Sequence, residues 1–255
     1  MLELPNSKIK KALLLGNEAV VRGALEAGLS FATTYPGTPA SEIGDTLAKI
    51  AKEAGFYFEY STNEKIALEA AAGAAFSGLP AMVSMKHYGL NVALDSLLPL
   101  VYLECPLVLV VADDPGSWSS IQSEQDSRWF SRLGQIPTLE PADAQEAKEM
   151  TKFAFELAKK YKMPIMVRLT TRVCHTRSLV KFGKIILPKK VGKFVKKKFA
   201  VGAGVTLTRH QKLIEKIKII QKEIVEKTEL NFTSTGKGKL GIVTSGISFY
   251  YVKEV

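Results

Sequence analysis

Short apolar runs alternate with longer amphipathic stretches along the first 180 residues of the chain. The apolar runs are mostly continuous, which is typical of strands that are buried on both faces of a parallel sheet. They predict strands at 11–15, 30–34, 56–60, 81–85, 107–112 and 164–169. The amphipathic stretches predict helices near 17–28, 39–54, 64–77, 91–103 and 142–161. Six strands separated by five helices indicate an α/β domain with a doubly wound, mainly parallel sheet over residues 1–180.

The pattern changes in the second part of the chain. Residues 181–200 are rich in lysine and contain Pro188, so we expect an extended strap there. Residues 206–229 predict a long amphipathic helix, because apolar residues recur on one side of it. These residues are Leu213, Ile217, Ile220 and Ile224. Strap and helix together predict a basic linker over residues 181–235.

Residues 236–255 predict the start of a second α/β domain. The sequence KLGIVTSGISFYYVKEV at 239–255 predicts a strand, a turn of small residues and the opening of a helix. A single unit of this kind cannot bury its own apolar face. We therefore expect it to pack on the first sheet or on a partner, or to belong to a longer or split polypeptide.

The composition, 46% apolar over 255 residues, is sufficient for a sizeable hydrophobic core. No apolar stretch reaches the roughly 18–20 residues of a membrane span. The N-terminus lacks the apolar run and the cleavage site of a signal peptide, so we expect a cytoplasmic protein. The two cysteines, Cys105 and Cys174, are far apart and form no CxxC pattern. Neither a disulfide framework nor a zinc or iron–sulfur site is therefore predicted in this chain.

The net charge of +10 is concentrated in one segment. Residues 1–180 hold 18 Lys and Arg against 20 Asp and Glu, whereas residues 181–230 hold 14 against 4. A basic tract of this kind could contact RNA or an acidic partner. We favour a solvated linker or a strap that docks on a partner over a nucleic-acid-binding surface.

The stretch TTYPGTPASE at 33–42 follows the second predicted strand. The carboxyl ends of the strands are where ligands bind in open parallel sheets. Thr38 is a suitable N-cap, Pro39 fits the first helical position, and Pro36-Gly37 favours a tight turn. A well-formed helix start explains these residues, but a helix N-terminus that carries a hydroxyl is also a potential site for a carboxylate or phosphate.

Two further turns after strands carry candidate site residues. Glu64 begins a helix rich in alanine, where the helix dipole alone explains a carboxylate. Facing an apolar cavity, the same carboxylate could share a proton with a bound heterocycle. His87, in Lys86-His87-Tyr88-Gly89, is predicted to lie in a turn. A core histidine and a site histidine are equal alternatives at this position.

A long polar loop follows the strand at 107–112. Its length and its many hydrogen-bonding groups favour a lid or an interface over a plain surface loop. The candidate lid residues are Asp113, Asp114, Glu124, Gln125, Asp126 and Arg128. The chain has no GxGxxG after its first strand and no Walker A sequence, which disfavours a nicotinamide or P-loop nucleotide site.

Five segments of the chain match one family in the same order. They are YPGTPASE at 35–42, NEKIALEAAAGAAFSG at 63–78, MKHYGLNVALDSL at 85–97, VVADDPGSWSS at 110–120 and EQDSR at 124–128. Together they resemble the thiamine-diphosphate-dependent 2-oxoacid:ferredoxin oxidoreductases, in particular the alpha subunit of the indolepyruvate enzymes. The resemblance covers about residues 10–175. It returns at 241–254, which is similar to the start of the family's second domain.

The resemblance implies that residues 1–180 are a pyrimidine-binding domain. Glu64 would be the catalytic glutamate that hydrogen-bonds N1′ of the aminopyrimidine of thiamine diphosphate and so promotes formation of the nucleophilic ylide. Thr38 would face the carboxylate of the 2-oxoacid. The residues implied at the substrate are Thr38, Gly37 and His87, and those implied at the cofactor are Glu64, Tyr88 and Gly89. The loop 113–128 would close over the substrate or meet a partner.

Departures from the family pattern limit these implications. Related pyruvate enzymes have an arginine after the strand at 107–112, where this chain has Asp113. This difference favours an arylpyruvate such as indolepyruvate over pyruvate. The diphosphate-binding half, with its magnesium motif and its cysteine-rich iron–sulfur segment, is not in this sequence. Thiamine diphosphate would therefore be shared with a partner domain or subunit, and Mg2+ and iron–sulfur clusters would lie on partner segments.

The favoured function is the pyrimidine-binding part of an enzyme that oxidatively decarboxylates a 2-oxoacid to an acyl-CoA and reduces ferredoxin. We expect an oligomer with no membrane-bound part. Two alternatives remain open. The first is a non-catalytic assembly module of the same fold, and the second is the pyrimidine-side subunit of a two-subunit thiamine-dependent 2-oxoacid decarboxylase.

Overall fold

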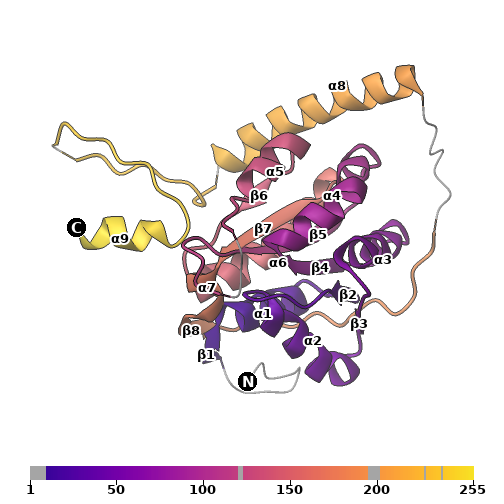
Figure 1. Cartoon of the computed structure of the whole chain (residues 1–255), viewed down its shortest axis with the longest axis horizontal. Helices are drawn as coiled ribbons and strands as arrows, with labels where there is room; N and C mark the ends of the chain where they lie inside the picture. The colour runs from indigo at the N-terminus through magenta and orange to yellow at the C-terminus, as the bar shows by residue number, and fades with distance from the viewer. Residues whose placement is uncertain (1–9, 120–122, 195–201, 227, 237) are drawn as a thin grey trace.

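A computed structural model describes residues 10–119, 123–194, 202–226, 228–236 and 238–255 of the chain. Its centre is a six-stranded parallel sheet in the order β3-β2-β4-β5-β7-β6 (Figure 1). The strands are β2 (Phe31–Thr34), β3 (Tyr57–Tyr60), β4 (Ala81–Lys86), β5 (Leu107–Asp113), β6 (Thr138–Leu139) and β7 (Ile165–Thr170). The predicted α/β class with a mainly parallel sheet is confirmed.

The central strands are buried because both of their faces are apolar. Every residue of β5 and of β7 is buried, as their continuous apolar runs predict. β5 lies between β4 and β7, with Val110 opposite Ser84 on one side and Val167 on the other. Parallel strands all end at the same edge of the sheet, so the turns that follow β2, β3, β4 and β5 share one rim.

Helices cover both faces of the sheet. On one face α1 packs against α2 and α6, and on the other α4 packs against α3 and α5. This two-sided arrangement is that of a doubly wound sheet. The helices are α1 (Gly16–Glu26), α2 (Ser41–Ala54), α3 (Glu64–Phe76), α4 (His87–Tyr102), α5 (Arg128–Gly134), α6 (Ala144–Tyr161) and the short α7 (Thr171–His175).

Two of these helices begin at side-chain caps. Asn63 Oδ1 accepts a hydrogen bond from the backbone N–H of Ile66 at 2.9 Å at the start of α3. Asp143 Oδ1 accepts one from the backbone N–H of Glu146 at 2.8 Å at the start of α6. Such caps satisfy donors that a helix leaves unpaired. The first of them fixes Glu64 as the first residue of α3.

The first predicted strand, β1 (Lys11–Leu15), does not join the parallel sheet. It pairs antiparallel with β8 (Arg177–Lys181), with Leu13 opposite Leu179. The prediction that all six apolar runs form one sheet is therefore wrong, and β6 takes the sixth position. In β1 only Leu14 is buried, so the apolar run KALLL covers a domain edge rather than lying between two layers of helices.

The strap after β8 is extended, as predicted, up to residue 194. Hydrogen bonds hold it on α1. Arg22 Nη2 donates to the carbonyl of Gly183 at 2.8 Å, and the Gly183 N–H donates to the Glu26 carboxylate at 2.7 Å. The Arg22 guanidinium also lies 4.0 Å from the centroid of the Phe182 ring. Residues 195–200 of the predicted strap lie outside the described residues.

The predicted amphipathic helix is confirmed, with different ends. It consists of α8 (Ala203–Ile220) and a π-helical turn, η1 (Gln221–Val225). Leu213 and Ile220 are buried against the domain, and α8 lies along α4 (Figure 1). Glu223 adds a 2.7 Å ion pair with Lys160. Within the described part of the chain, no helix is long and apolar enough to cross a membrane.

The strand predicted near the C-terminal end is not formed. As far as residues 238–247 are described, none lies in a strand, whereas the predicted helix opening is α9 (Ser248–Glu254). A strand needs a neighbour with free backbone groups, and β6, at the nearby edge, has only two residues. Side chains hold the segment instead. Ser245 Oγ donates to Glu140 at 2.9 Å, and the Tyr250 hydroxyl donates to Asp143 at 2.6 Å.

Candidate functional site

The candidate residues gather at the rim where the central strands end. Just below it, the Thr34 hydroxyl donates to the carbonyl of Ser84 at 2.8 Å and accepts from the Ser84 hydroxyl at 3.0 Å. This pair fixes the end of β2 against β4. The segments that leave the rim are the turn 35–40, the start of α3, the start of α4 and the loop after β5, which is described at 114–119 and 123–127.

The turn after β2 differs from the prediction. The Thr38–Pro39 peptide bond is cis, and the Ala40 N–H donates to the carbonyl of Gly37 at 2.8 Å. α2 begins only at Ser41, with Ala40 in the N-cap position. The predictions of Thr38 as the N-cap and of Pro39 as the first helical residue are therefore wrong, because the chain closes a turn before helical bonding starts. The half-buried Thr38 side chain makes no hydrogen bond to any described residue.

Asn17, near the start of α1, holds this turn. Its Nδ2 donates to the carbonyl of Pro39 at 2.8 Å and to Glu42 Oε2 at 2.7 Å. Asn17 is fully buried, and its Oδ1 has no partner in the part of the chain that is described. Asn17 was not predicted as a site residue, because a lone asparagine in LLLGNEA forms no motif. Its place directly after a predicted strand was the available signal.

Glu64 lies in a nearly closed environment. It is 8% exposed, and its carboxylate has no hydrogen bond or ion pair with a described residue. Gly89 of α4 faces it, since a Cβ at Gly89 would lie 2.6 Å from Glu64 Oε1 and 2.8 Å from its Cδ. The structure thus brings Glu64 and Gly89 together, and the missing side chain at Gly89 leaves room for the carboxylate.

His87 does not lie in a turn, as predicted, but is the first residue of α4. The helix follows β4 directly, because Lys86 keeps an extended conformation and serves as the N-cap residue. The His87 side chain is fully buried, with Nδ1 3.4 Å from the carbonyl of Ala112. Its Nε2 has no partner among the described residues. The backbone carbonyl of His87, not the ring, meets the loop, where Gln125 Nε2 donates to it at 2.9 Å.

Tyr88 contacts the loop after β5, and Lys86 contacts the turn after β2. The Tyr88 hydroxyl lies 2.8 Å from the hydroxyl of Ser123 in the loop. The Lys86 ammonium lies 5.1 Å from the centroid of the Tyr88 ring, and the Lys86 side chain lies against Gly37. Lys86 was not selected from the sequence, because a lysine at the end of a strand is ordinarily a solvated residue.

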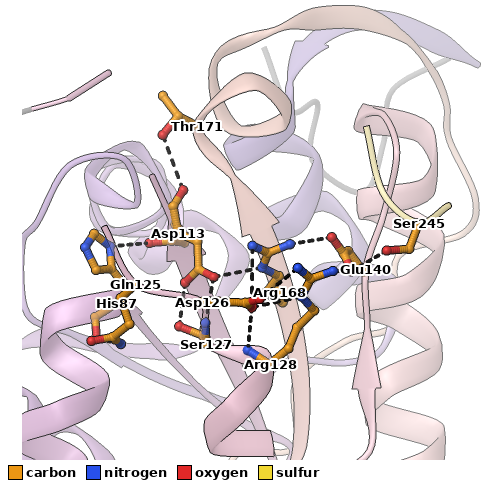
Figure 2. A network of polar contacts seen from close by, with 11 residues as sticks. His87, Asp113, Gln125, Asp126, Ser127, Arg128, Glu140, Arg168, Thr171 and Ser245 are labelled. Atoms are coloured by element: carbon orange, nitrogen blue, oxygen red, sulfur yellow. Dashed lines mark hydrogen bonds and ion pairs between the residues drawn. The ribbon is translucent and has the colours of Figure 1, made fainter. Parts of the chain in front are cut away.

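Asp113 belongs to a buried network rather than to an exposed lid (Figure 2). Arg168 of β7 lies between Asp113 and Glu140, and its Nε donates to Asp113 Oδ2 at 2.8 Å. Asp113 Oδ2 also accepts from the N–H of Ser127 at 2.9 Å. Asp113 and Arg168 are 0% and 4% exposed, so this ion pair is buried and each charge has a partner. Arg168 was not predicted as a site residue, although a charge within an apolar strand indicates a buried partner.

Asp114 anchors the first part of the loop. It accepts hydrogen bonds from the N–H of Ser119 at 2.6 Å, from the N–H of Trp118 at 3.2 Å and from the Thr171 hydroxyl. Burial alone would raise the pKa of Asp114, but these hydrogen bonds outweigh it and lower the pKa below 3.8. Asp114 is therefore an ionised anchor of the loop at neutral pH.

The outer part of the loop carries a more exposed ion pair. Arg128 donates from Nη2 to Asp126 Oδ2 and from Nε to Asp126 Oδ1, both at 2.8 Å. The hydrogen bond from Arg128 lowers the pKa of Asp126. Glu124 accepts from the N–H of Gly116 across the loop. These predicted lid residues thus hold the loop in shape rather than point at the rim.

Three loop residues do reach the rim. Ser119 Oγ lies 3.5 Å from the carbonyl of Thr38, Gln125 contacts His87, and Ser123 contacts Tyr88. The described parts of the loop, 114–119 and 123–127, therefore contact both the turn after β2 and the start of α4. Of the predicted lid residues, Gln125 is the one that makes such a contact among those described.

A cavity of about 550 Å3 lies beside the network, between β7 and the C-terminal segment. Thr170 and Arg172 line it from the domain, and Thr244 and Tyr251 line it from the segment. The hydroxyls of Thr170 and Thr244 are buried without a partner in the described residues. Glu64 does not line this cavity. Among the described residues, no group of His, Cys, Asp and Glu side chains could hold a metal ion.

Comparisons with known proteins point to one family. A family model described as pyruvate flavodoxin/ferredoxin oxidoreductase, thiamine diphosphate-binding, matches residues 22–234. Over 96% of its length the chain is 47% identical to indolepyruvate oxidoreductase subunit IorA of Thermococcus kodakarensis and 46% identical to that of Methanothermobacter thermautotrophicus. It covers 39% and 40% of those two proteins. The chain thus spans about two fifths of the length of these relatives.

Two further likenesses are more distant. The chain is 32% identical, over 69% of its length, to 2-oxoglutarate synthase subunit KorA of Methanothermobacter thermautotrophicus, of which it covers 47%. A solved 2-oxoglutarate:ferredoxin oxidoreductase from Magnetococcus marinus, with 2-oxoglutarate, coenzyme A and succinyl-CoA bound, matches with a TM-score of 0.77. That match covers 96% of this chain and 50% of the other, at 19% identity, and it concerns the fold.

Proposed function

Because the chain belongs to the pyruvate flavodoxin/ferredoxin oxidoreductase family of thiamine diphosphate-binding domains, we propose that it supplies the pyrimidine-binding part of a 2-oxoacid:ferredoxin oxidoreductase. The complete enzyme would oxidatively decarboxylate a 2-oxoacid, transfer the acyl group to coenzyme A and reduce ferredoxin. Similarity over 96% of the chain to IorA subunits supports an arylpyruvate, indolepyruvate first, as the substrate.

The observation that carries the proposal is the Glu64 carboxylate. It is nearly buried, faces Gly89 and has no partner among the described residues. A buried carboxylate without a hydrogen bond is unfavourable, and a ring nitrogen of an aminopyrimidine that shares a proton with the carboxylate would supply that bond. Thiamine diphosphate, when bound, supplies a nucleophilic carbon and an electron sink for decarboxylation. Glu64 would hold a proton at the ring nitrogen, and Gly89 would give the ring access to the carboxylate.

We assign the Gly37-Thr38 turn to the carboxylate of the 2-oxoacid. Since Thr38 does not cap α2, its hydroxyl is not used by the helix. It makes no hydrogen bond to a described residue and can donate to an anion. Because the His87 ring is buried, we assign it no direct contact with the substrate. Its proposed role is to support the ring of Tyr88 at the rim.

We assign the loop 114–127 to covering the substrate. Its contacts with Thr38, His87 and Tyr88 support this role. The Asp113 carboxylate is occupied by Arg168 and Ser127, so it is not aimed at the substrate. The Asp113 carboxylate therefore does not repel an anionic substrate directly.

The partners of the chain are part of the proposal. We assign the diphosphate-binding domain, Mg2+ and the iron–sulfur clusters to partner segments, since the chain spans about two fifths of its IorA relatives. Coenzyme A and ferredoxin are proposed as partners because the proposed reaction uses both. An oligomeric assembly is proposed because the site needs a partner domain or subunit. The division of the chain at residues 180 and 235, and a cytoplasmic location, stay predictions.

The test is reconstitution of the chain with the diphosphate-binding partner. Ferredoxin reduction is measured with indolepyruvate, pyruvate and 2-oxoglutarate, each with coenzyme A. We expect indolepyruvate to be the best substrate, and Glu64→Gln to lower the rate by about 10²–10⁴-fold. Unchanged activity of Glu64→Gln would contradict the assignment. An aldehyde product without reduced ferredoxin would indicate a decarboxylase, and no thiamine diphosphate binding in calorimetry would indicate an assembly module.

A further inference from the structure

Lys86 lies between two parts of the rim. One is the Gly37-Thr38 turn, which the proposed function assigns to the substrate, and the other is the start of α4 with Gly89, which it assigns to the cofactor. Lys86 is the last residue of β4, where it pairs with Ala112 of β5, and it is also the N-cap residue of α4. Both the sheet and the helix therefore fix its backbone. The fold therefore sets the direction in which the Lys86 side chain leaves the backbone.

The aliphatic part of the side chain lies on the turn after β2. A Cβ added at Gly37 would lie 2.9 Å from both Cγ and Cδ of Lys86. A side chain at position 37 would therefore displace the Lys86 side chain. Beyond the turn, the ammonium lies 5.1 Å from the centroid of the Tyr88 ring. The Lys86 side chain thus lies between the turn that contains Thr38 and the ring of Tyr88.

The Lys86 ammonium has no ion pair with a carboxylate among the described residues. Two other lysines that are withdrawn from solvent do have one. Lys148 lies 3.3 Å from Glu26, and Lys216 lies 3.1 Å from Glu104. Taking an ammonium partly out of water without a counter-charge is unfavourable. The Lys86 ammonium is therefore available to a counter-charge that comes with a ligand.

We propose that Lys86 is a substrate-binding residue whose ammonium binds the carboxylate of the 2-oxoacid, next to the Thr38 hydroxyl. The proposal rests on the proposed function of the same rim. It names an anionic headgroup as the feature that is recognised, because an ammonium and a hydroxyl are both hydrogen-bond donors toward it. The contact with the Tyr88 ring holds the ammonium only weakly and leaves it free to pair with the ligand.

The first test compares variants of the reconstituted enzyme. Lys86→Met keeps most of the aliphatic stem and removes the charge, whereas Lys86→Arg keeps the charge. We expect Lys86→Met to raise KM for indolepyruvate roughly 10- to 100-fold, as for loss of a charge-assisted hydrogen bond, with kcat little changed. Lys86→Arg should recover most of the loss. Lys65→Met is the matched control, because Lys65 pairs with Asp95 on the surface of the domain.

A second measurement separates charge recognition from a structural effect. Equilibrium binding of indole-3-acetate, a carboxylate, is compared with that of the neutral indole-3-acetamide by calorimetry. Lys86→Met should weaken binding of the acid roughly 10-fold or more and leave that of the amide unchanged. Equal losses for both ligands, or no loss for the acid, would overturn the proposal.

The contact with Gly37 provides an independent check. Gly37→Ala should displace the Lys86 stem and raise KM, but it should add little to Lys86→Met, because both changes remove the same interaction. Additive effects would contradict this. If the wild-type enzyme oxidises indolepyruvate and Lys86→Met does not change KM, only the Lys86 proposal fails. If the wild type oxidises no 2-oxoacid, the proposed function fails, and the acid–amide comparison still decides the role of Lys86.

Discussion

Two charged regions share the rim of the sheet and are built in opposite ways. In the network around Asp113, each buried charge has a partner, with Arg168 between two carboxylates. At the starts of α3 and α4, by contrast, neither Glu64 nor Lys86 has an ion pair with a described residue. Paired charges hold a structure in place, whereas buried or half-buried charges without partners are unfavourable unless a ligand satisfies them. The contrast therefore separates the scaffold of the rim from its binding surface.

The largest effect on stability should come from breaking the network. Asp113→Asn leaves the buried Arg168 guanidinium with one carboxylate fewer, so we expect the free energy of unfolding to fall by about 3 kcal/mol. Urea unfolding of the chain measures this. The matched control is Arg128→Gln, which breaks the more exposed pair with Asp126 and should cost no more than about 0.5 kcal/mol. Equal costs for the two variants would remove the distinction between the regions.

The next effect concerns the room that Gly89 leaves for Glu64. Gly89→Ala puts a methyl group 2.6 Å from Glu64 Oε1, so the carboxylate must move. We expect the affinity of the reconstituted enzyme for thiamine diphosphate to fall about 10- to 100-fold, or about 1.4–2.7 kcal/mol, as measured by calorimetry.

Gly73→Ala is the control for that substitution. It adds the same methyl group to α3 where no atom lies within 4 Å. Because alanine favours a helix interior, this variant should gain about 0.5–1 kcal/mol of stability and bind thiamine diphosphate normally. Normal binding by Gly89→Ala as well would show that the contact with Glu64 does not matter for the cofactor.

A smaller effect is expected when the charge of Glu64 is removed without the cofactor. Glu64→Gln relieves the cost of an unpartnered carboxylate but loses a favourable position at a helix N-terminus. The two effects oppose each other, so the free energy of unfolding should stay within about 1 kcal/mol of the wild type. A loss near that of Asp113→Asn would mean that Glu64 belongs to the scaffold and not to the binding surface.

The smallest effect is on the acid side of the stability profile. The pKa of Asp114 is lowered below 3.8 in the folded protein, so its carboxylate stabilises the fold above that pH. This contribution is lost as the pH falls through the folded-state pKa. Asp114→Asn should therefore flatten the fall in stability below about pH 4. Unfolding curves between pH 5 and 2 would test this, and an unchanged acid slope would contradict it.

The features that depend on local pattern were predictable from the sequence. The burial of β5 and β7 follows from continuous apolar runs, and α6 follows from its helical periodicity and its Asp143 cap. The edge of the sheet where site residues gather follows from the parallel order of the strands. Glu64 could be located at the start of α3 because the cap residue Asn63 stands directly before it.

The features that depend on partners distant in the sequence were not predictable in this way. The apolar run at residues 11–15 predicted a strand but not the sheet that the strand joins. The start of α2 was misjudged because the turn before it is held by Asn17, 22 residues from Pro39. Arg168 and Lys86 were missed because their surroundings, a carboxylate on β5 for one and a glycine after β2 for the other, exist only in the folded chain.

Glu140 gives the molecule a mechanical property. It accepts hydrogen bonds from Arg168 and from Ser245, so one carboxylate joins the domain to the segment that carries α9. Arg168 in turn holds Asp113, which holds Ser127 at the far end of the loop. The segment beyond residue 240 and the end of the loop at Ser127 are therefore joined through three side chains, those of Glu140, Arg168 and Asp113.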